Sequence, residues 1–169
     1  MFTYTSYKPH FHDAIQRLGE AIFEDDASHQ IHISLRDAIP ESIVVLHHRR
    51  VVGFALLAHT RFFGRLDALE LSYLVVHPDY QGKGIGSTLL QKVKEINPIV
   101  VLEVSYFNPD AERLYSRHGF NIWRNMYTKA TGGYLMGWSK QRDERMLRLR
   151  SRQSPQEGEI EAPSTTHHP

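Results

Sequence analysis

The chain has 169 residues, no cysteine and a formal net charge of +1. Its 41% hydrophobic and 23% charged residues are typical of a globular protein with one core. The missing cysteines exclude disulfides, cysteine metal sites and a cysteine nucleophile, and the near-neutral charge gives no overall bias towards nucleic acid or membrane. No stretch approaches the roughly 18 apolar residues of a membrane span, and residues 1–9 do not resemble a signal peptide, so we expect a soluble cytoplasmic protein.

The first part of the chain predicts one strand followed by helices. Alternation over residues 2–7 predicts a short β-strand. Apolar residues recur at helical spacing within 11–23, which predicts an amphipathic helix. Residues 24–30 are polar and are expected to form a loop, and residues 31–39 are expected to form a short helix that stops before Pro40.

The middle of the chain predicts three strands. Residues 42–46 and 51–57 are rich in β-forming residues, and the four residues 47–50 between them suit a hairpin. These four residues lack the glycine that is typical of such turns. Residues 66–76 form the longest predicted strand, which ends where the chain turns at Pro78.

The second half predicts alternating helices and strands. Residues 84–96 carry apolar side chains at helical spacing and predict an amphipathic helix. Residues 99–104 predict a buried strand, and residues 109–118 a helix whose proline stands in the first turn, where its missing N–H is harmless. Two closing strands are predicted over 120–127 and 134–138.

The chain divides at about residue 140. Residues 1–140 predict one α/β domain, and residues 141–169 a charged C-terminal tail that we expect to be disordered. The tail starts with a basic run, Arg142 to Arg152, and continues as a polar, proline-bearing segment for which we expect disorder. Binding of nucleic acid by the basic run is not favoured, because the run is short and acidic residues follow it.

A glycine-rich turn, Gln-Gly-Lys-Gly-Ile-Gly at residues 81–86, separates the longest predicted strand from a predicted helix. Glycines there let backbone N–H groups approach an anion, and the positive end of the helix dipole favours negative charge. The segment lacks the order of a Walker loop and is tighter than a Rossmann fingerprint. It indicates a phosphate-binding turn, although a glycine-rich turn alone is equally compatible with a structural role.

Two motifs together resemble the GCN5-related N-acetyltransferase (GNAT) superfamily. Residues 76–86 look like its acetyl-CoA motif, Q/R-x-x-G-x-G/A, and a second match follows at residues 108–115, with Gly119-Phe120 after it. The resemblance implies a mixed, splayed central sheet of about six to seven strands flanked by about four helices. It also implies acetyl-CoA as cosubstrate, with no metal.

Within the superfamily the pattern is nearest to N-terminal acetyltransferases of the ribosomal-protein-alanine type. The chain departs from that pattern at residues 126–127 and 132–133, so the identity of the acceptor is not carried over. The resemblance implies an N-acetyltransferase that acts on a primary amine, which is a protein N-terminus, a lysine or a small polyamine. The alternative is a catalytically silent acyl-CoA sensor on the same fold. The sequence leaves a homodimer open.

The resemblance assigns the cofactor contacts residue by residue. The pantetheine arm is expected beside the backbone of Leu74, Val75 and Val76. The pyrophosphate is expected to be held by Gln81, Gly82, Lys83, Gly84, Ile85 and Gly86. Lys83 either adds charge there or is simply solvated.

Acetyl transfer requires a neutral amine held beside the thioester and a proton for the leaving thiolate. Because no cysteine can form an acyl-enzyme, direct transfer in a ternary complex is the simpler hypothesis. The spacing of Tyr115 after Asn108 matches the family tyrosine that protonates the sulfur, so Tyr115 is the candidate general acid and a cofactor contact. Its alternative is a packed aromatic. Asn108 resembles the family asparagine near the cofactor arm and can also cap its helix.

Two glutamates are candidates for the general base. Glu70 stands eleven residues before Gln81, where several family members place a catalytic glutamate, and Glu103 stands where the N-terminal acetyltransferases place theirs. Apolar β-rich surroundings would raise the pKa of either carboxyl group towards neutrality. Each can instead be an outward, solvated residue of an alternating strand, and the sequence does not rank the two.

The acceptor site is expected to include Asp25, Asp26 and Tyr127. The two aspartates lie in an acidic loop that would attract a cationic acceptor, with a solvated loop as the alternative. The 11 histidines are scattered and lack supporting carboxylates at ligand spacing, so no metal site is expected.

Overall fold

A computed structural model of the protein describes residues 1–23, 31, 34–60, 67–127 and 132–153. The strands are β1 (Thr3–Ser6), β2 (Ile43–His47), β3 (Arg50–His59), β4 (Leu69–Val76), β5 (Ile99–Ser105), β6 (Asn121–Tyr127) and β7 (Gly132–Ser139). The helices are α1 (His12–Ile22), α3 (Ile85–Ile96), α4 (Pro109–Arg117) and α5 (Lys140–Gln153), with 3₁₀ turns η1 (Pro9–Phe11) and η3 (Pro78–Tyr80).

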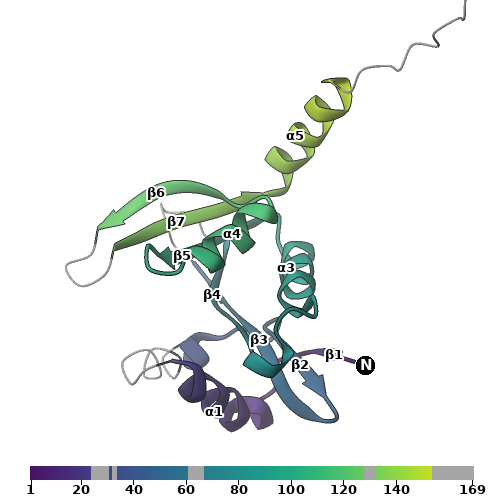
Figure 1. Ribbon diagram of the computed structural model, residues 1–169, viewed down its shortest axis with the longest axis vertical. Coiled ribbons are helices and arrows are strands. Elements are labelled where there is room, and N and C mark those ends of the chain that lie inside the picture. Colours follow the sequence, from purple (N-terminus) through teal and green to yellow (C-terminus); the bar gives the residue numbers. More distant parts are fainter. Residues whose placement is uncertain (24–30, 32–33, 61–66, 128–131, 154–169) are drawn as a thin grey trace, which may run out of the picture.

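Within these residues the strands form one seven-stranded sheet in the order β1-β2-β3-β4-β5-β7-β6 (Figure 1). The β4–β5 pair is parallel, and the other neighbouring pairs are antiparallel. The predicted fold class, a mixed α/β sheet flanked by helices, is confirmed. The predicted strands and helices before residue 140 that the structure describes agree with the observed ends to within three residues.

Two predicted segments, residues 24–30 and 31–39, are not fully covered by this comparison between predicted and observed elements. The predicted loop at residues 24–30 lies outside the described residues. Of the predicted helix at residues 31–39, residue 31 and residues 34–37 are helical.

The hairpin between β2 and β3 is tighter than the sequence suggests. His47 pairs with Arg50, which leaves a turn of two residues, His48 and Arg49. Both adopt left-handed backbone angles, with φ of 46° and 64°. A two-residue turn of this kind favours glycine and asparagine because φ is positive at both positions. The turn therefore keeps two residues although it lacks glycine, and its two residues adopt strained backbone angles.

The tail differs from its prediction over its first part. Residues 141–153 were expected to be disordered, but α5 extends from Lys140 to Gln153 and leads away from the sheet (Figure 1). Lys, Arg, Gln, Glu, Met and Leu are good helix formers, and no proline occurs in the helix. Residues 154–169 lie outside the described residues. No helix in the described ranges is both long and apolar enough to cross a bilayer.

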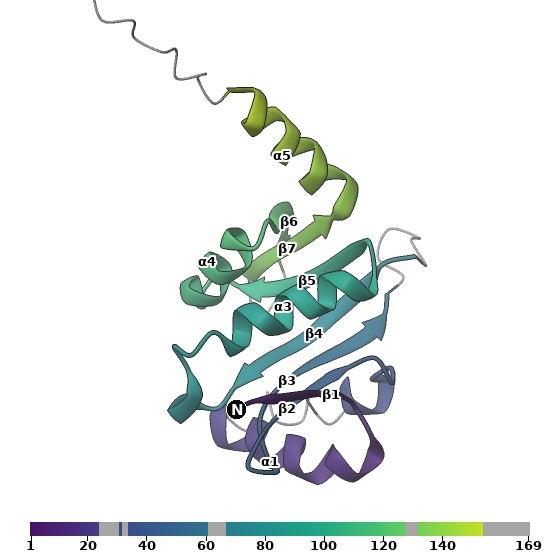
Figure 2. The ribbon, with the colours of Figure 1, turned by 90° about the vertical axis from the view of Figure 1, so that its right-hand side faces the viewer.

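Two hydrophobic clusters cover the two faces of the sheet. The larger cluster packs α3 and α4 against the sheet and includes the fully buried Leu89 and Leu90. The smaller cluster packs α1 onto β2, β3 and β4 and includes Ile15 and Phe54. Burial of each such side chain contributes about 1.5–3 kcal/mol, so these two clusters fix which face each helix covers. Figure 2 shows α3 and α4 in front of the sheet, with α1 at its lower end.

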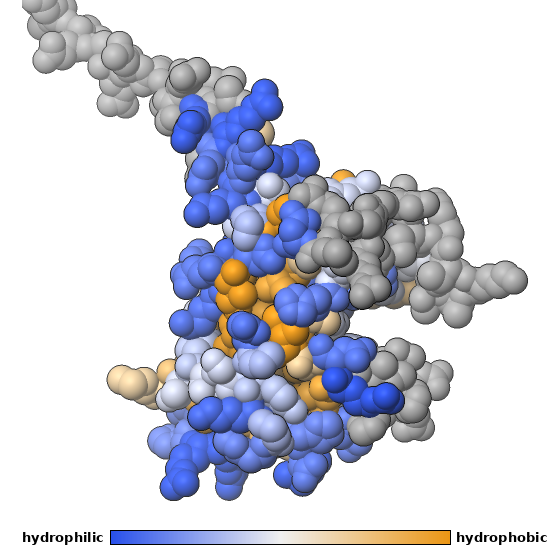
Figure 3. Space-filling model, turned by 180° about the vertical axis from the view of Figure 1, so that it is seen from behind, coloured by the Kyte–Doolittle hydropathy of each residue, from blue (hydrophilic) through white to orange (hydrophobic). Residues whose placement is uncertain are grey.

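Apolar surface remains in the middle of the molecule. Figure 3 shows a band of hydrophobic residues there, between the polar surfaces of the α1 end and of the α5 end.

Candidate active site

The turn that follows β4 leaves the N-terminus of α3 open. Gly82 and Gly84 have φ of +74° and +81°, and Gly84 is the N-cap residue of α3. No side chain caps this helix, and its first turn contains no acidic residue. Within the described chain, the amides of residues 82–87 donate to no backbone carbonyl. These N–H groups and the helix dipole are therefore available to an anion.

Open space adjoins the two left-handed glycines. A Cβ atom added at Gly82 or Gly84 would meet no atom within 4 Å. These glycines are therefore required by the backbone angles and not by internal crowding. The side-chain amide of Gln81 donates to the carbonyl oxygen of Val76 over 3.1 Å, which fixes the turn to the end of β4.

A cavity of about 310 Å³ adjoins this turn. It is lined by Leu74, Val76, Tyr80, Gln81, Gly82, Gly84, Ile85, Gly86, Ser87, Leu114 and Arg117. Arg117 is the charged member of this lining, and no carboxylate is among these residues, so the cavity suits an anionic ligand. Lys83 is exposed and is not among the lining residues.

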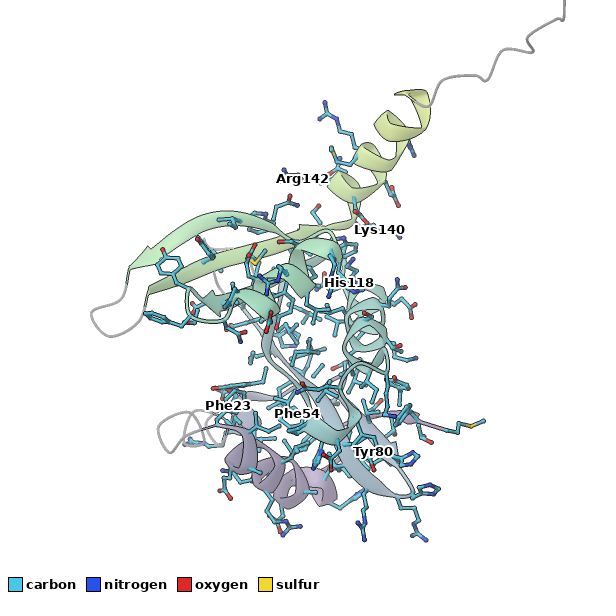
Figure 4. All side chains as sticks on the ribbon, in the orientation of Figure 1. Phe23, Phe54, Tyr80, His118, Lys140 and Arg142 are labelled. Carbon is cyan, nitrogen blue, oxygen red and sulfur yellow. The ribbon has the colours of Figure 1, made fainter. Side chains whose placement is uncertain are left out.

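Most of the cofactor contacts expected from the sequence are thus brought together, and four further residues join them. The additional lining residues, which the sequence analysis missed as cofactor contacts, are Tyr80, Ser87, Leu114 and Arg117. Ser87 is held by His118, whose Nε2 lies 3.0 Å from its Oγ, and this contact joins α3 to the end of α4. Figure 4 labels His118 at that end of α4. The position of Ser87 in the first turn after the glycines was the available signal for it. Arg117 carried no such signal, because it belongs to a different helix.

The sheet opens between β4 and β5. Their parallel pairing is limited to two positions, Leu69 with Val100 and Glu70 with Val101. Beyond them β4 continues to Val76 and β5 to Ser105 without a shared register. A sheet opened in this way presents unpaired backbone N–H and C=O groups along both strands, which can bond an extended ligand. The predicted splay is confirmed.

A bulge in β4 exchanges its two faces. Leu56 pairs with Tyr73 and Leu57 with Leu71, which leaves Ser72 as the extra residue. Before the bulge, Leu71 packs on the α3 side of the sheet; after it, Tyr73 packs on the α1 side. Strand alternation therefore places Glu70 on the α1 side, the same side as Tyr73.

Glu103 lies close to Glu70. Val101 pairs with Glu70 in register, and Glu103, two residues further along β5, projects from the same face. Burial raises the pKa of Glu70, and the negative charge of Glu103 raises it further. Glu103 itself is exposed. The two candidate bases thus share one face of the opening, and the pKa of the Glu70 carboxyl group is raised above its usual range.

Tyr115 lies in the larger core cluster, 9% exposed, with its ring 5.8 Å from that of Phe120. Burial raises the pKa of its phenol to about 12. In the described chain the hydroxyl makes no hydrogen bond, and it is not one of the fully buried unpaired groups. A ligand can therefore accept a hydrogen bond from it. Asn108 caps α4 by accepting a hydrogen bond from the Ala111 amide at 3.2 Å.

The expected acceptor residues are less completely described. Asp25 and Asp26 lie outside the described residues. Tyr127 ends β6, opposite Gly132 in β7. The structure adds an aromatic pair near Glu70: the rings of Phe23 and Tyr73 lie 5.7 Å apart, one after α1 and one on β4. Among the described residues no group of three or more His, Asp or Glu is placed to hold a metal ion.

A splayed mixed sheet with an open helix N-terminus beside the gap defines the class of acyl-CoA-dependent transferases with the GNAT fold. The family model described as acetyltransferase (GNAT) domain matches residues 40–122. Residues 40–122 therefore form a GNAT acetyltransferase domain. No curated protein matches it in sequence.

Solved structures share the fold over most of the chain. The ribosomal-protein-S18-alanine N-acetyltransferase of Escherichia coli is 20% identical, with a TM-score of 0.63 over 82% of this chain and 94% of its own. Naa50 of Arabidopsis thaliana, in complex with the bisubstrate analogue CoA-Ac-MVNAL, is 21% identical, with a TM-score of 0.65 over 82% and 98%. Arabidopsis thaliana NAA60 in complex with acetyl-CoA is 17% identical, with a TM-score of 0.70 over 82% and 99%.

Proposed function

We propose that the protein transfers an acetyl group from acetyl-CoA directly to a primary amine in a ternary complex. The observation that carries this proposal is the uncapped N-terminus of α3 beside the opening between β4 and β5. The backbone amides of residues 82–87 would hold the pyrophosphate, and the free strand edges would bond the pantetheine arm. The thioester would then lie between the two faces of the sheet, with the amine arriving from the α1 side.

We assign Glu70 as the general base and Glu103 as its electrostatic partner. The amine nitrogen attacks the carbonyl carbon, the C–S bond breaks, and the nitrogen gives up one proton. A half-buried carboxylate with a raised pKa is the better acceptor for that proton, directly or through one water molecule. The carboxylate of Glu103 would contribute a negative potential that attracts an ammonium group.

Tyr115 supplies the hydrogen bond to the leaving sulfur. Its phenol stays protonated at neutral pH because burial raises its pKa. The products are then an acetylated amine and free coenzyme A.

The α-amine of a peptide N-terminus is the acceptor we favour. With a pKa near 7.7–8.0, about a quarter of α-amines are neutral at pH 7.4, against about 0.1% of lysine side chains with a pKa near 10.4. The negative charge of Glu103 beside Glu70 favours the protonated form of an amine, so these two groups would not help to deprotonate a lysine. The structural similarity to an enzyme named for an N-terminal alanine acceptor supports the same choice.

A peptide library with free N-termini, incubated with acetyl-CoA and read by mass spectrometry, tests the proposal. A matched library with blocked N-termini but free lysines, together with a set of polyamines, separates the acceptor classes. Acetylation of the first library alone is the expected result. Tight binding of coenzyme A by calorimetry, without transfer to any acceptor, would instead establish an acyl-CoA sensor.

A further inference from the structure

A second pocket lies between α1 and the β2–β3 hairpin, outside the proposed active site. Its volume is about 560 Å³, which is within the range of small-molecule sites. Phe11, Leu18 and Val51 contribute apolar surface to it, and Arg17, Arg49 and Arg50 contribute positive charge. None of its described lining residues carries a carboxylate. We call it the hairpin pocket.

The three arginines of the hairpin pocket have no partners among the described residues. In the described part of the chain none of them takes part in an ion pair or a hydrogen bond. They come from two separate elements, Arg17 from α1 and the other two from the hairpin. His10 and His77 also line the pocket. Guanidinium groups gathered at one pocket repel one another, and a bound anion would reduce that repulsion.

Arg49 also stands where a glycine would cost less. Its φ of 64° and the φ of 46° at His48 belong to the left-handed region, which costs roughly 1–2 kcal/mol for each residue with a side chain. Asn-Gly would give the same turn with little strain. An arginine at a strained position, next to two other arginines, is a local inconsistency that is typical of a functional site.

We propose that the hairpin pocket binds an organic phosphate, a small molecule with one phosphate group on an apolar or aromatic body. Guanidinium groups bind phosphate through paired, charge-assisted hydrogen bonds. The apolar lining would cover the body of the ligand. A bare inorganic ion would make no use of this lining. A long polyanion fits less well, because the exposed Asp13 and Glu20 flank Arg17 at helical spacing and interrupt the positive surface.

This site is separate from the proposed coenzyme A site. The cofactor cavity is lined mainly by α3, α4 and the glycine turn, whereas the hairpin pocket is lined mainly by α1 and the hairpin. None of the described residues lines both cavities. The test can therefore be carried out with coenzyme A present at saturation, so that the probe does not bind in its place.

The test is calorimetry of the full chain with phenyl phosphate as the probe. Phenol and inorganic phosphate serve as probes that lack one half of the proposed ligand. We expect phenyl phosphate to bind at least about tenfold more tightly than either, and the double variant Arg17→Gln/Arg49→Gln to lose at least about tenfold of this affinity. Arg145→Gln, an exposed arginine on α5, is the matched control and should bind as the unmodified chain does.

Arg49→Gly gives the sharpest contrast. Relief of the left-handed strain should raise the melting temperature, while loss of the guanidinium should weaken phenyl phosphate binding. Amide shifts in NMR spectra should map to α1 and to residues 49–51. Unchanged affinity in the double variant, equal affinity for inorganic phosphate, or competition with coenzyme A would each overturn the proposal. Tighter binding of an RNA oligomer than of phenyl phosphate would also overturn it.

Discussion

Replacement of Tyr115 by phenylalanine tests the proposed chemistry most directly. The substitution removes one oxygen atom that makes no hydrogen bond in the described chain, and it keeps the ring that packs near Phe120. The fold should therefore be stable to within about 1 kcal/mol of the unmodified protein. Any large loss of activity must then come from the reaction.

The size of that loss follows from the pKa of the phenol. Its rise from 10.0 to about 12 corresponds to about 2.7 kcal/mol against the phenolate. A thiol such as that of coenzyme A has a pKa near 8.5, so complete proton transfer from Tyr115 to the thiolate would be uphill by about 4.8 kcal/mol. Tyr115 should therefore act as a hydrogen-bond donor to the developing thiolate. Loss of one such donor lowers kcat by about 10²–10³-fold.

Single-turnover and steady-state kinetics, combined with calorimetry of coenzyme A, separate the alternatives. We expect Tyr115→Phe to lower kcat by this factor and to change the Kd of coenzyme A by less than about threefold. Tyr4→Phe, on β1 and also packed against the core, is the matched control and should keep full activity. If Tyr115→Phe retains more than a third of kcat, or if its whole defect is in Kd, the donor role is refuted.

Three further predictions concern the carboxylate pair and the two turns. In Glu103→Gln, loss of the neighbouring charge should lower the pKa of Glu70, so the acid limb of the pH–rate profile should move to lower pH; an unmoved limb would mean that Glu70 is not the base. The pKa of Glu70 is raised in the folded state, so its carboxylate destabilises the fold at any pH above the pKa that Glu70 has in the unfolded chain. Glu70→Gln should therefore stabilise the protein against urea at pH 7 and not at pH 4, and it should abolish activity because the proposed base is lost. Gly84→Ala should cost about 1–2 kcal/mol in thermal unfolding, because φ is +81°, and should weaken coenzyme A binding about tenfold by calorimetry; His48→Asn, which relieves strain at the other turn, should instead raise stability, and equal effects of the two would contradict the strain argument.

Sequence periodicity was sufficient for most of the fold. The helix at residues 85–96 and the strand at residues 99–105 have strong apolar patterns, and their ends follow from glycine and proline. The prediction for the tail rested on its charged and polar composition and did not include the helix propensity of its first residues, so the helical start was missed. Long runs of Arg, Lys, Gln and Leu favour a helix even where few contacts hold it against a core.

The candidate site was predictable where its residues are neighbours in sequence. The glycine turn is such a segment, and its left-handed backbone angles were implied by its composition. Arg117 could not be assigned in this way, because its place beside the turn depends on how α4 packs against the sheet. The choice between Glu70 and Glu103 also required the fold, since it rests on their relative burial and on the charge that each places near the other.

The bulge at Ser72 connects these observations. Without the extra residue, regular alternation would place Leu71 and Tyr73 on the same face of β4, and either a leucine would leave the core or a tyrosine would enter it. With it, β4 packs against α3 before and after the bulge while it presents Glu70 and Tyr73 together on the α1 side. The bulge also falls just after the last position at which β4 pairs with β5. One extra residue therefore accompanies the opening of the sheet and brings Tyr73 to the same side as Glu70, the proposed base.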